Sequence, residues 1–427
     1  MDTTTNRFKT AGLIFFFLFT LFICISKSAV EILSGLLLAL AIVCLLKTAC
    51  RNSMAANRPV FILLLTLAAG FLMSLFSLSG PLKGAAGFVE QYRFFLLVLP
   101  FSIFATSEKS MNFLFTGLNL SALISMSYGI FEMNFHNIWG ESIGFHAIGR
   151  NSDMLISIAL MNLTMILSHH FESRVRAIAV KTIIGINTAF MVTAVFLMLR
   201  RGSYLGLMAG VSILLVLMRK TKILALIVLV LCSVLYFSDI RIVDRVKSIM
   251  DFNGDESNRE RIQLLRTGTD FLMDEHLFFH GTGAEQSKSP FTTYFYSHPP
   301  EYQHQNRDII KKQYFGNFHN SFLQMAVEDG VFFLLMYLST IGYILLIFGR
   351  SLSRLPDHQK IYPMAAIVVT IGFFISQFFH SDLYSYGGIP FILMFAAGCQ
   401  VITQHRIQNS NTATDGHVNA DTEKYGD

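Results

Sequence analysis

Three short polar segments carry the side chains of this chain that could do chemistry, and each lies beside a long apolar run. The first is Leu199-Arg200-Arg201-Gly202-Ser203-Tyr204, where two arginines lie in a short connection between apolar runs. A guanidinium group binds two phosphate oxygens at once, and a glycine lets the backbone approach a ligand closely. This segment is therefore a candidate anion site. The alternative is a tight turn whose arginines reach lipid phosphates.

The second segment covers residues 258–266 and contains two candidate ligand-binding residues, Arg259 and Arg261. Apolar residues recur at near-helical spacing along it, which predicts a helix lying on the membrane surface. A solvated charged face is the alternative. The turn Gly281-Thr282-Gly283 follows, and by itself it is weak evidence for a phosphate loop.

The third segment contains His319 and Asn320 and is followed by Glu328-Asp329-Gly330. A histidine accepts or delivers a proton near neutral pH, so His319 could meet a sugar hydroxyl at the membrane boundary. In the alternative, Asn317 caps a helix and His319 fills a wet interface. Asp329-Gly330 is most simply a helix break before the next apolar run.

The spacing of Asp, His and Cys in the sequence suggests neither a metal site nor a disulfide framework. The polar region lacks an Asp-x-Asp sequence, and the histidines other than His319 in it have no ligand spacing. The five cysteines lie in or at the edges of apolar runs. We therefore expect no metal, no cofactor and no disulfide framework.

Composition fixes the class of protein. Of the 427 residues, 53% are hydrophobic and 14% are charged, and there are 41 phenylalanines. A soluble domain could not bury so much apolar surface. The sequence predicts an all-α, polytopic integral membrane protein with about twelve transmembrane helices. The net charge of +5 reflects Lys and Arg in short connections, which set orientation, so membrane lipids are expected partners and nucleic acid is not.

The apolar runs that could span a membrane are separated by short connections except for one large polar loop. The fourth run is short for a bilayer, so we expect that helix to begin earlier, between Gly84 and Arg93. The predicted spans are 11–26, 29–46, 59–79, 93–106, 113–131, 152–168, 182–199, 203–218, 223–238, 331–349, 361–379 and 389–403.

This pattern divides the chain into four parts. Residues 1–238 hold spans one to nine, residues 239–319 form a large, partly helical periplasmic loop, and residues 320–403 hold the last three spans. Residues 404–427 are polar and are predicted to be a disordered cytoplasmic tail. The first run is interpreted as a retained helix rather than a signal peptide. Basic connections predict the cytoplasmic face, and the adjacent pair Arg200 and Arg201 contradicts that bias, which strengthens their candidacy as a site.

Together, the three segments resemble the O-antigen ligase and polymerase superfamily of bacterial envelope glycosyltransferases over about residues 182–349. The matching elements are Arg201-Gly202, Glu260-Arg261 leading to Gly281-Thr282-Gly283, and His319-Asn320 followed by Glu328-Asp329-Gly330. The chain departs from the family where Arg200 precedes the family arginine and where Leu265 replaces an aromatic residue. Arg200 and Arg259 are therefore possible substitutes for the two family arginines.

The resemblance implies a glycosyltransferase of the bacterial inner membrane, with its active site facing the periplasm. An O-antigen ligase moves glycan from undecaprenyl diphosphate to a hydroxyl of the lipid A-core oligosaccharide. Arg201 and Arg261 would replace a metal in neutralising the diphosphate, and His319 would orient or deprotonate the hydroxyl, giving inversion. Asn320 lies beside His319 as a substrate-binding candidate.

Two further outer-face arginines are substrate-binding candidates, Arg93 near an early helix end and Arg150 before the sixth span. For Arg93 the alternative is an ion pair with Glu90. The same residues fit an O-antigen polymerase or an O-linked oligosaccharyltransferase. A transporter or flippase is the weakest alternative, because the centres of the spans hold almost no charged residues.

Overall fold

The computed structural model describes residues 3–136, 145, 148–168, 174–198, 200–220, 255–380 and 383–422. Within these ranges all regular structure is helical and there is no β-strand. This confirms the all-α prediction. In the described part of the chain, eight helices are long and apolar enough to cross a membrane, and three more are apolar but shorter.

Eleven of the twelve predicted spans correspond to helices. The ninth, 223–238, lies outside the described residues, so the total of about twelve stays a prediction. Outside the fourth span, these helices are α1 (Thr3–Phe22), α2 (Lys27–Leu45), α4 (Arg58–Ser74), α7 (Glu108–His136), α8 (Ile148–Ser168), α9 (Arg174–Leu197), α10 (Arg201–Leu217), α18 (Val331–Ser351), α19 (Asp357–Gln377) and α20 (Ile389–Thr422).

The fourth span begins earlier than its most apolar residues, as expected. Helices α5 (Pro81–Tyr92), η1 (Arg93–Leu97) and α6 (Val98–Phe104) follow one another without a break. Together, Pro81–Phe104 is a 24-residue candidate span. Pro81 lies at the first helical turn, where its missing N–H costs nothing.

The centre of the bundle is formed by α8, α19 and α20, and α10 packs along α19. Every residue in the most apolar 18-residue stretch of α20 is buried. In α2 and α9, which lie at the periphery, 28% of the corresponding stretch is buried. Gly206 of α10 and Gly372 of α19 face each other, and a Cβ on Gly206 would lie 2.5 Å from the carbonyl oxygen of Gly372. Small residues permit this close approach, which fixes the start of α10 beside the end of α19.

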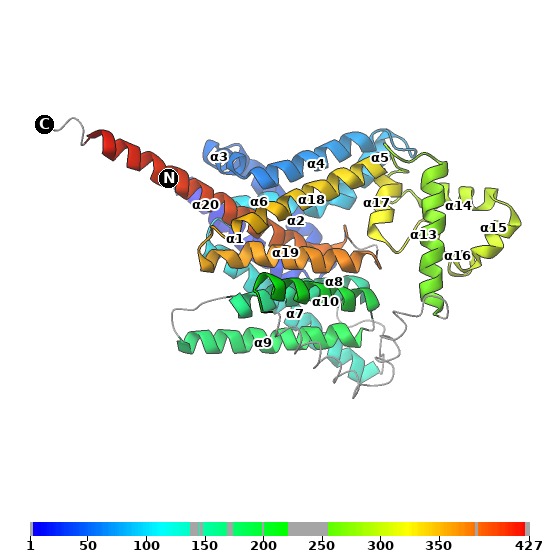
Figure 1. The fold of residues 1–427 in the computed structure, drawn as a ribbon, viewed down its shortest axis with the longest axis horizontal. Helices are drawn as coiled ribbons and strands as arrows, with labels where there is room; N and C mark the ends of the chain where they lie inside the picture. Colours follow the sequence, from blue (N-terminus) through cyan, green and yellow to red (C-terminus); the bar gives the residue numbers. More distant parts are fainter. Residues whose placement is uncertain are drawn as a thin grey trace.

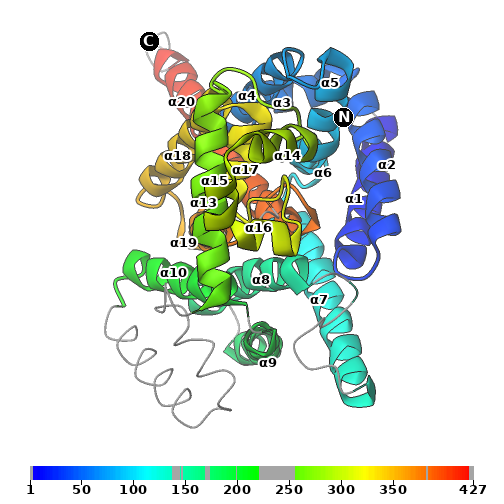
Figure 2. The same cartoon turned by 90° about the vertical axis from the view of Figure 1, so that its right-hand side faces the viewer.

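Helix α13 (Glu256–Asp274) lies across one end of the bundle, nearly perpendicular to α10, α18 and α19 (Figures 1 and 2). Leu264 and Phe271 of α13 are buried in a separate apolar core. Ile262 and Leu265, two of the apolar residues that recur at near-helical spacing in this segment, are half exposed. The other helices of this region are α14 (Lys288–Ser297), α15 (Pro300–Gln305), α16 (Arg307–Lys312) and α17 (Ser321–Asp329).

The large loop is therefore partly helical from residue 255 onwards, while its predicted beginning at 239–254 lies outside the described residues. The short helix α3 (Thr48–Ala56), in the basic connection after α2, lies at the bundle end away from α13 (Figure 1). Which end faces the periplasm stays a prediction.

The last helix, α20, continues to Thr422 and does not end at residue 404, where the tail was predicted to begin. The polar composition after His405 predicts that these residues are not buried in the bundle. It does not determine whether their backbone is helical. The cytoplasmic location of this segment stays a prediction.

Candidate functional site

Arg201 is the first residue of α10 and its side chain joins two helix ends. The side chain is 3% exposed, and its two terminal nitrogens donate to Asp255 Oδ1 and Asn258 Oδ1, each at 2.6 Å. Asp255 also caps α13, because its carboxylate accepts from the backbone N–H of Asn258 at 3.0 Å. The guanidinium fork of Arg201 therefore connects the N-terminal ends of α10 and α13.

Arg261 lies one helical turn after Asn258 on α13, so Arg201 and Arg261 lie at the same end of the bundle. The guanidinium carbon of Arg261 lies 5.7 Å from the centre of the Phe379 ring, just after α19. Its charge acts on His319 and also on His380, as does the charge of Arg200. Arg200, Arg261, His319 and His380 thus form one arginine–histidine cluster, with Arg201 beside it.

His319 lies in a tight turn before α17 with a φ angle of 49°, in the left-handed region. Its backbone N–H donates to Asn317 Oδ1 at 3.1 Å, and its ring packs edge-on against Tyr314 with centroids 4.7 Å apart. The Nε2 atom is buried and has no hydrogen-bond partner within the described ranges. Burial, Arg261 and Arg200 lower the pKa of His319 to about 4, so the imidazole is neutral at neutral pH.

His380, which the sequence reasoning missed, follows α19 and is 3% exposed. Its Nδ1 atom lies 3.5 Å from Nη1 of Arg200. Burial is the main reason that its pKa lies well below 6.5, and Arg200, Arg261 and His319 lower it further. Its position in the predicted outer turn after the eleventh span was the one signal that could have identified it.

Two other candidates have structural partners outside the cluster. Arg259 donates to Asp308 at 2.9 Å, within the loop region, and its side chain is 44% exposed. Asn320 is the N-cap of α17, where its Oδ1 accepts from two backbone N–H groups at 3.0 Å each. The cap of this helix is thus Asn320 and not Asn317, as the alternative interpretation supposed.

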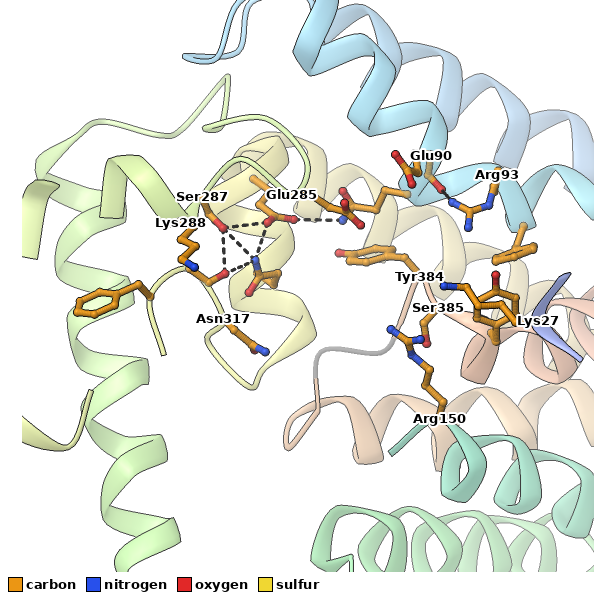
Figure 3. Close-up of a pocket in the computed structure, with 17 residues that line it drawn as sticks. Lys27, Glu90, Arg93, Arg150, Glu285, Ser287, Lys288, Asn317, Tyr384 and Ser385 are labelled. Carbon is orange, nitrogen blue, oxygen red and sulfur yellow. Dashed lines mark hydrogen bonds between the residues drawn. The ribbon is translucent and has the colours of Figure 1, made fainter. Parts of the chain in front are cut away.

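A cavity of about 420 Å³ is lined in part by Asn317, which accepts from the backbone N–H of His319. Figure 3 shows Lys27, Arg93 and Arg150 on one side of it and Ser287, Lys288 and Asn317 on the opposite side. The lining is mixed in charge and rich in polar groups. It also includes Glu90, Gln91, Glu285, Gln324, Glu328, Tyr384, Ser385 and Tyr386.

Both outer-face arginine candidates line this cavity. Arg93 donates to the two carboxylate oxygens of Glu31 at 3.1 and 2.5 Å, and to the backbone carbonyl of Glu90. The side-chain ion pair is therefore with Glu31 and not with Glu90. The guanidinium carbon of Arg150 lies 6.0 Å from the ring centre of Tyr386. Tyr386 donates to Glu31 and so connects the two arginines.

The Gly-x-Gly turn and the acidic segment after His319 form one structural unit. The N–H groups of Thr282 and Gly283 donate to the carbonyls of Val327 and Glu328, each at 2.9 Å. A Cβ on Gly281 would lie 2.1 Å from the carbonyl carbon of Glu328, so only glycine fits. The turn therefore packs against α17.

The carboxyl group of Glu328 is buried at the end of the cavity. It accepts from Gln324 Nε2 at 2.6 Å and from Ser287 Oγ at 3.0 Å. Burial raises its pKa to about 7 despite these two hydrogen bonds, which lower it. The neighbouring Asp329 accepts from the hydroxyl of Tyr92 at 2.7 Å. These contacts attach α17 to α5 and to the loop.

Among the residues that the structure describes, no group of three or more His, Cys, Asp or Glu side chains is arranged to hold a metal ion. The polar groups available for a ligand in the cluster are guanidinium and imidazole nitrogens. Such groups bind anions and exchange protons.

Residues 186–338 match the sequence model of the O-antigen ligase family, whose members are glycosyltransferase-like enzymes of O-antigen processing. The matched region includes α10, α13 and α17, and hence Arg201, Arg261 and His319. No curated protein matches the chain. The comparison therefore shows similarity to the O-antigen ligase family over this region, which contains all three motifs.

Proposed function

We propose that this protein is an O-antigen ligase of the bacterial inner membrane. It moves O-antigen glycan from undecaprenyl diphosphate to a hydroxyl of the lipid A-core oligosaccharide, at the periplasmic face and with inversion. The observation that carries the proposal is the cluster itself. Three residues from distant parts of the sequence meet at one end of the bundle: Arg200 before α10, Arg261 of α13 and His319 before α17. The charges of the two arginines act on the imidazole of His319.

In this proposal the donor diphosphate binds at the guanidinium groups of the cluster. Departure of the diphosphate leaves negative charge on its oxygens, which fixed cations stabilise. Both terminal nitrogens of Arg201 already bind Asp255 and Asn258. We assign direct contact with the diphosphate to Arg200 and Arg261, whose charges act on both His319 and His380, and we assign Arg201 the role of holding α10 and α13 together.

His319 receives the proton of the acceptor hydroxyl at Nε2. The hydroxyl oxygen bonds to the anomeric carbon while the carbon–oxygen bond to the diphosphate breaks, and the electron pair leaves with the diphosphate. Attack opposite the leaving group inverts the configuration. A bound diphosphate offsets the charges of Arg200 and Arg261, which lower the pKa of His319. Donor binding thus raises that pKa and makes His319 a stronger base.

The acceptor saccharide occupies the neighbouring cavity of about 420 Å³. Its mixed lining of guanidinium, carboxylate, amide and hydroxyl groups suits a polyhydroxylated sugar. Arg93 and Arg150 are the proposed cationic contacts for phosphate groups of the acceptor.

A second, shallow groove of about 750 Å³ shares Glu90 and Arg93 with this cavity. The rest of its lining is mainly apolar and includes Phe71, Leu82 and Val89. That groove is suited to lipid chains of the acceptor.

Deletion of the gene in its host, followed by analysis of lipopolysaccharide and lipid-linked glycan, tests the proposal. Full-length glycan accumulating on the lipid carrier, with bare lipid A-core, is the expected result. Single repeat units attached to the core would instead identify a polymerase, and glycosylated protein lost on deletion would identify an oligosaccharyltransferase. Unchanged glycans would refute all three. Complementation with Arg261→Ala or His319→Ala is expected to fail.

A further inference from the structure

His380 is a buried histidine that none of the roles proposed above uses. Its backbone carbonyl accepts from Ser321 Oγ at 2.9 Å, which ties it to the start of α17. Its ring lies against the first turn of α10, because a Cβ on Gly202 would be 2.7 Å from His380 Nε2. Helices α10, α17 and α19 therefore all fix the position of this ring next to Arg200.

The contact with Arg200 fixes which ring nitrogen of His380 carries the proton. A guanidinium group has donors and no acceptor, so Nδ1 of His380 must accept from Nη1 of Arg200, 3.5 Å away. A neutral imidazole then carries its proton on Nε2. Burial and the charges of Arg200 and Arg261 keep this ring neutral. His380 is thus an Nε2–H donor.

This donor is buried and has no hydrogen-bond partner within the parts of the chain that the structure describes. A buried donor without an acceptor is costly, and such groups mark functional positions. It lies at the N-terminal end of α10, where the first backbone N–H groups have no acceptor within the helix and the helix dipole favours an anion. The hydroxyl of Ser203, in the same turn, is also buried without a partner among the described residues.

We propose that His380 Nε2–H donates to a phosphoryl oxygen of the lipid diphosphate, beside Arg200 and at the N-terminal end of α10. This inference rests on the proposed function and adds a residue to its donor site. Nε2 is covered by Gly202 in the structure, so binding requires a small movement of the ring or of the 200–203 turn. Gly202 is the residue type that permits this movement, since any Cβ would press on the ring.

Two amide substitutions separate donation to the ligand from support of Arg200. The side-chain amide of Gln reaches the position of Nε2, so His380→Gln keeps a donor there. The shorter Asn reaches the position of Nδ1, so His380→Asn keeps only the contact with Arg200. Purified full-length protein in lipid nanodiscs would be titrated with glycan-free undecaprenyl diphosphate. His304→Ala, an exposed histidine of α15, is the matched control.

We expect His380→Gln to bind within about threefold of the wild type, and His380→Asn and His380→Ala to bind about 10- to 100-fold more weakly, as for loss of a hydrogen bond to a charged group. Wild-type affinity in His380→Asn, or in His380→Ala, would overturn the proposal, as would loss of affinity confined to His380→Gln. Thermal unfolding of each variant separates loss of binding from loss of folding. A wild-type protein that binds no undecaprenyl diphosphate would refute the proposed function together with this inference.

Discussion

Arg200 and His380 are in contact although 180 positions separate them in the sequence, with Nη1 of the arginine 3.5 Å from Nδ1 of the histidine. The contact joins the beginning of α10 to the end of α19. The charge of Arg200 acts on both His319 and His380, and so does the charge of Arg261 from α13. The following predictions test this arrangement.

Arg261→Ala is expected to lower the rate of glycan transfer by about a hundredfold or more, because a fixed cation opposite the departing diphosphate is lost. Arg261→Lys keeps the charge and loses the fork, so it should recover only part of the rate. Transfer in membranes from a deletion strain measures both. Arg266→Ala, at an exposed position of the same helix, is the control and should be active. Normal transfer by Arg261→Ala would contradict the proposed donor site.

Arg201→Ala is expected to destabilise the protein by about 1.5–3 kcal/mol, because the largely buried carboxylate of Asp255 loses the hydrogen bond from the guanidinium group. Arg200→Ala should leave stability nearly unchanged and reduce transfer. Chemical unfolding in detergent, combined with transfer assays, distinguishes these two effects. If Arg201→Ala unfolds like the wild type, the assigned role of joining α10 and α13 is wrong.

The pH dependence of donor turnover tests His319. Its pKa of about 4 in the free protein means that the base is lost only near that pH. The acid limb of kcat/KM for the donor should therefore lie well below the ordinary histidine value of about 6.5. In Arg261→Gln one cation that lowers the pKa is absent, so the acid limb should move to higher pH. An acid limb that is unchanged in Arg261→Gln would argue against this electrostatic coupling.

Glu328→Gln is expected to fold and to lose a pH dependence of stability that the wild type has. The folded pKa of Glu328 is raised from 4.5 to about 7, so the folded state holds this proton over a range where the unfolded state releases it. The contribution of this carboxyl group to the free energy of unfolding is therefore greatest below about pH 4.5, and it is lost as the pH rises towards 7. Thermal unfolding between these values measures the slope. Glu328→Ala, which cannot bind Gln324 or Ser287, should be less stable at every pH.

Gly202→Ala is expected to lower glycan transfer at least about tenfold, because its Cβ would lie 2.7 Å from both His380 Nε2 and Phe379 Cβ. Gly342→Ala in α18 is the matched control, since a Cβ there meets no atom within 4 Å. Transfer assays on both variants, at equal expression, make the comparison. Full activity of Gly202→Ala would show that the ring position of His380 does not matter.

Much of the architecture could be predicted because membrane helices are specified locally. A run of apolar residues needs no distant partner to be recognised, and the helices around Lys27–Leu45 or Val331–Ser351 begin and end close to the predicted limits. The three polar segments were identifiable for the same reason. Arg201, Arg261 and His319 each belong to a short pattern that the family match covers.

The contacts between these segments could not be predicted, because they depend on where helix ends meet. Charge spacing suggested Glu90 as the partner of Arg93, whereas the partner is Glu31 of α2. The pairing of the Gly281–Gly283 turn with Val327 and Glu328 was also invisible in the sequence, although both segments had been noted.

The sequence by itself determined the class of protein, most of its helices and the types of residue that could bind a lipid diphosphate. Only the tertiary structure decided that Arg200 contacts His380 whereas Arg201 binds Asp255 and Asn258, and that His380 belongs to the arginine–histidine cluster. The physical reason is the close packing of α10 on α19 through Gly206 and Gly372, which sets the two helix ends side by side. Hydropathy and charge patterns contain no information on that alignment.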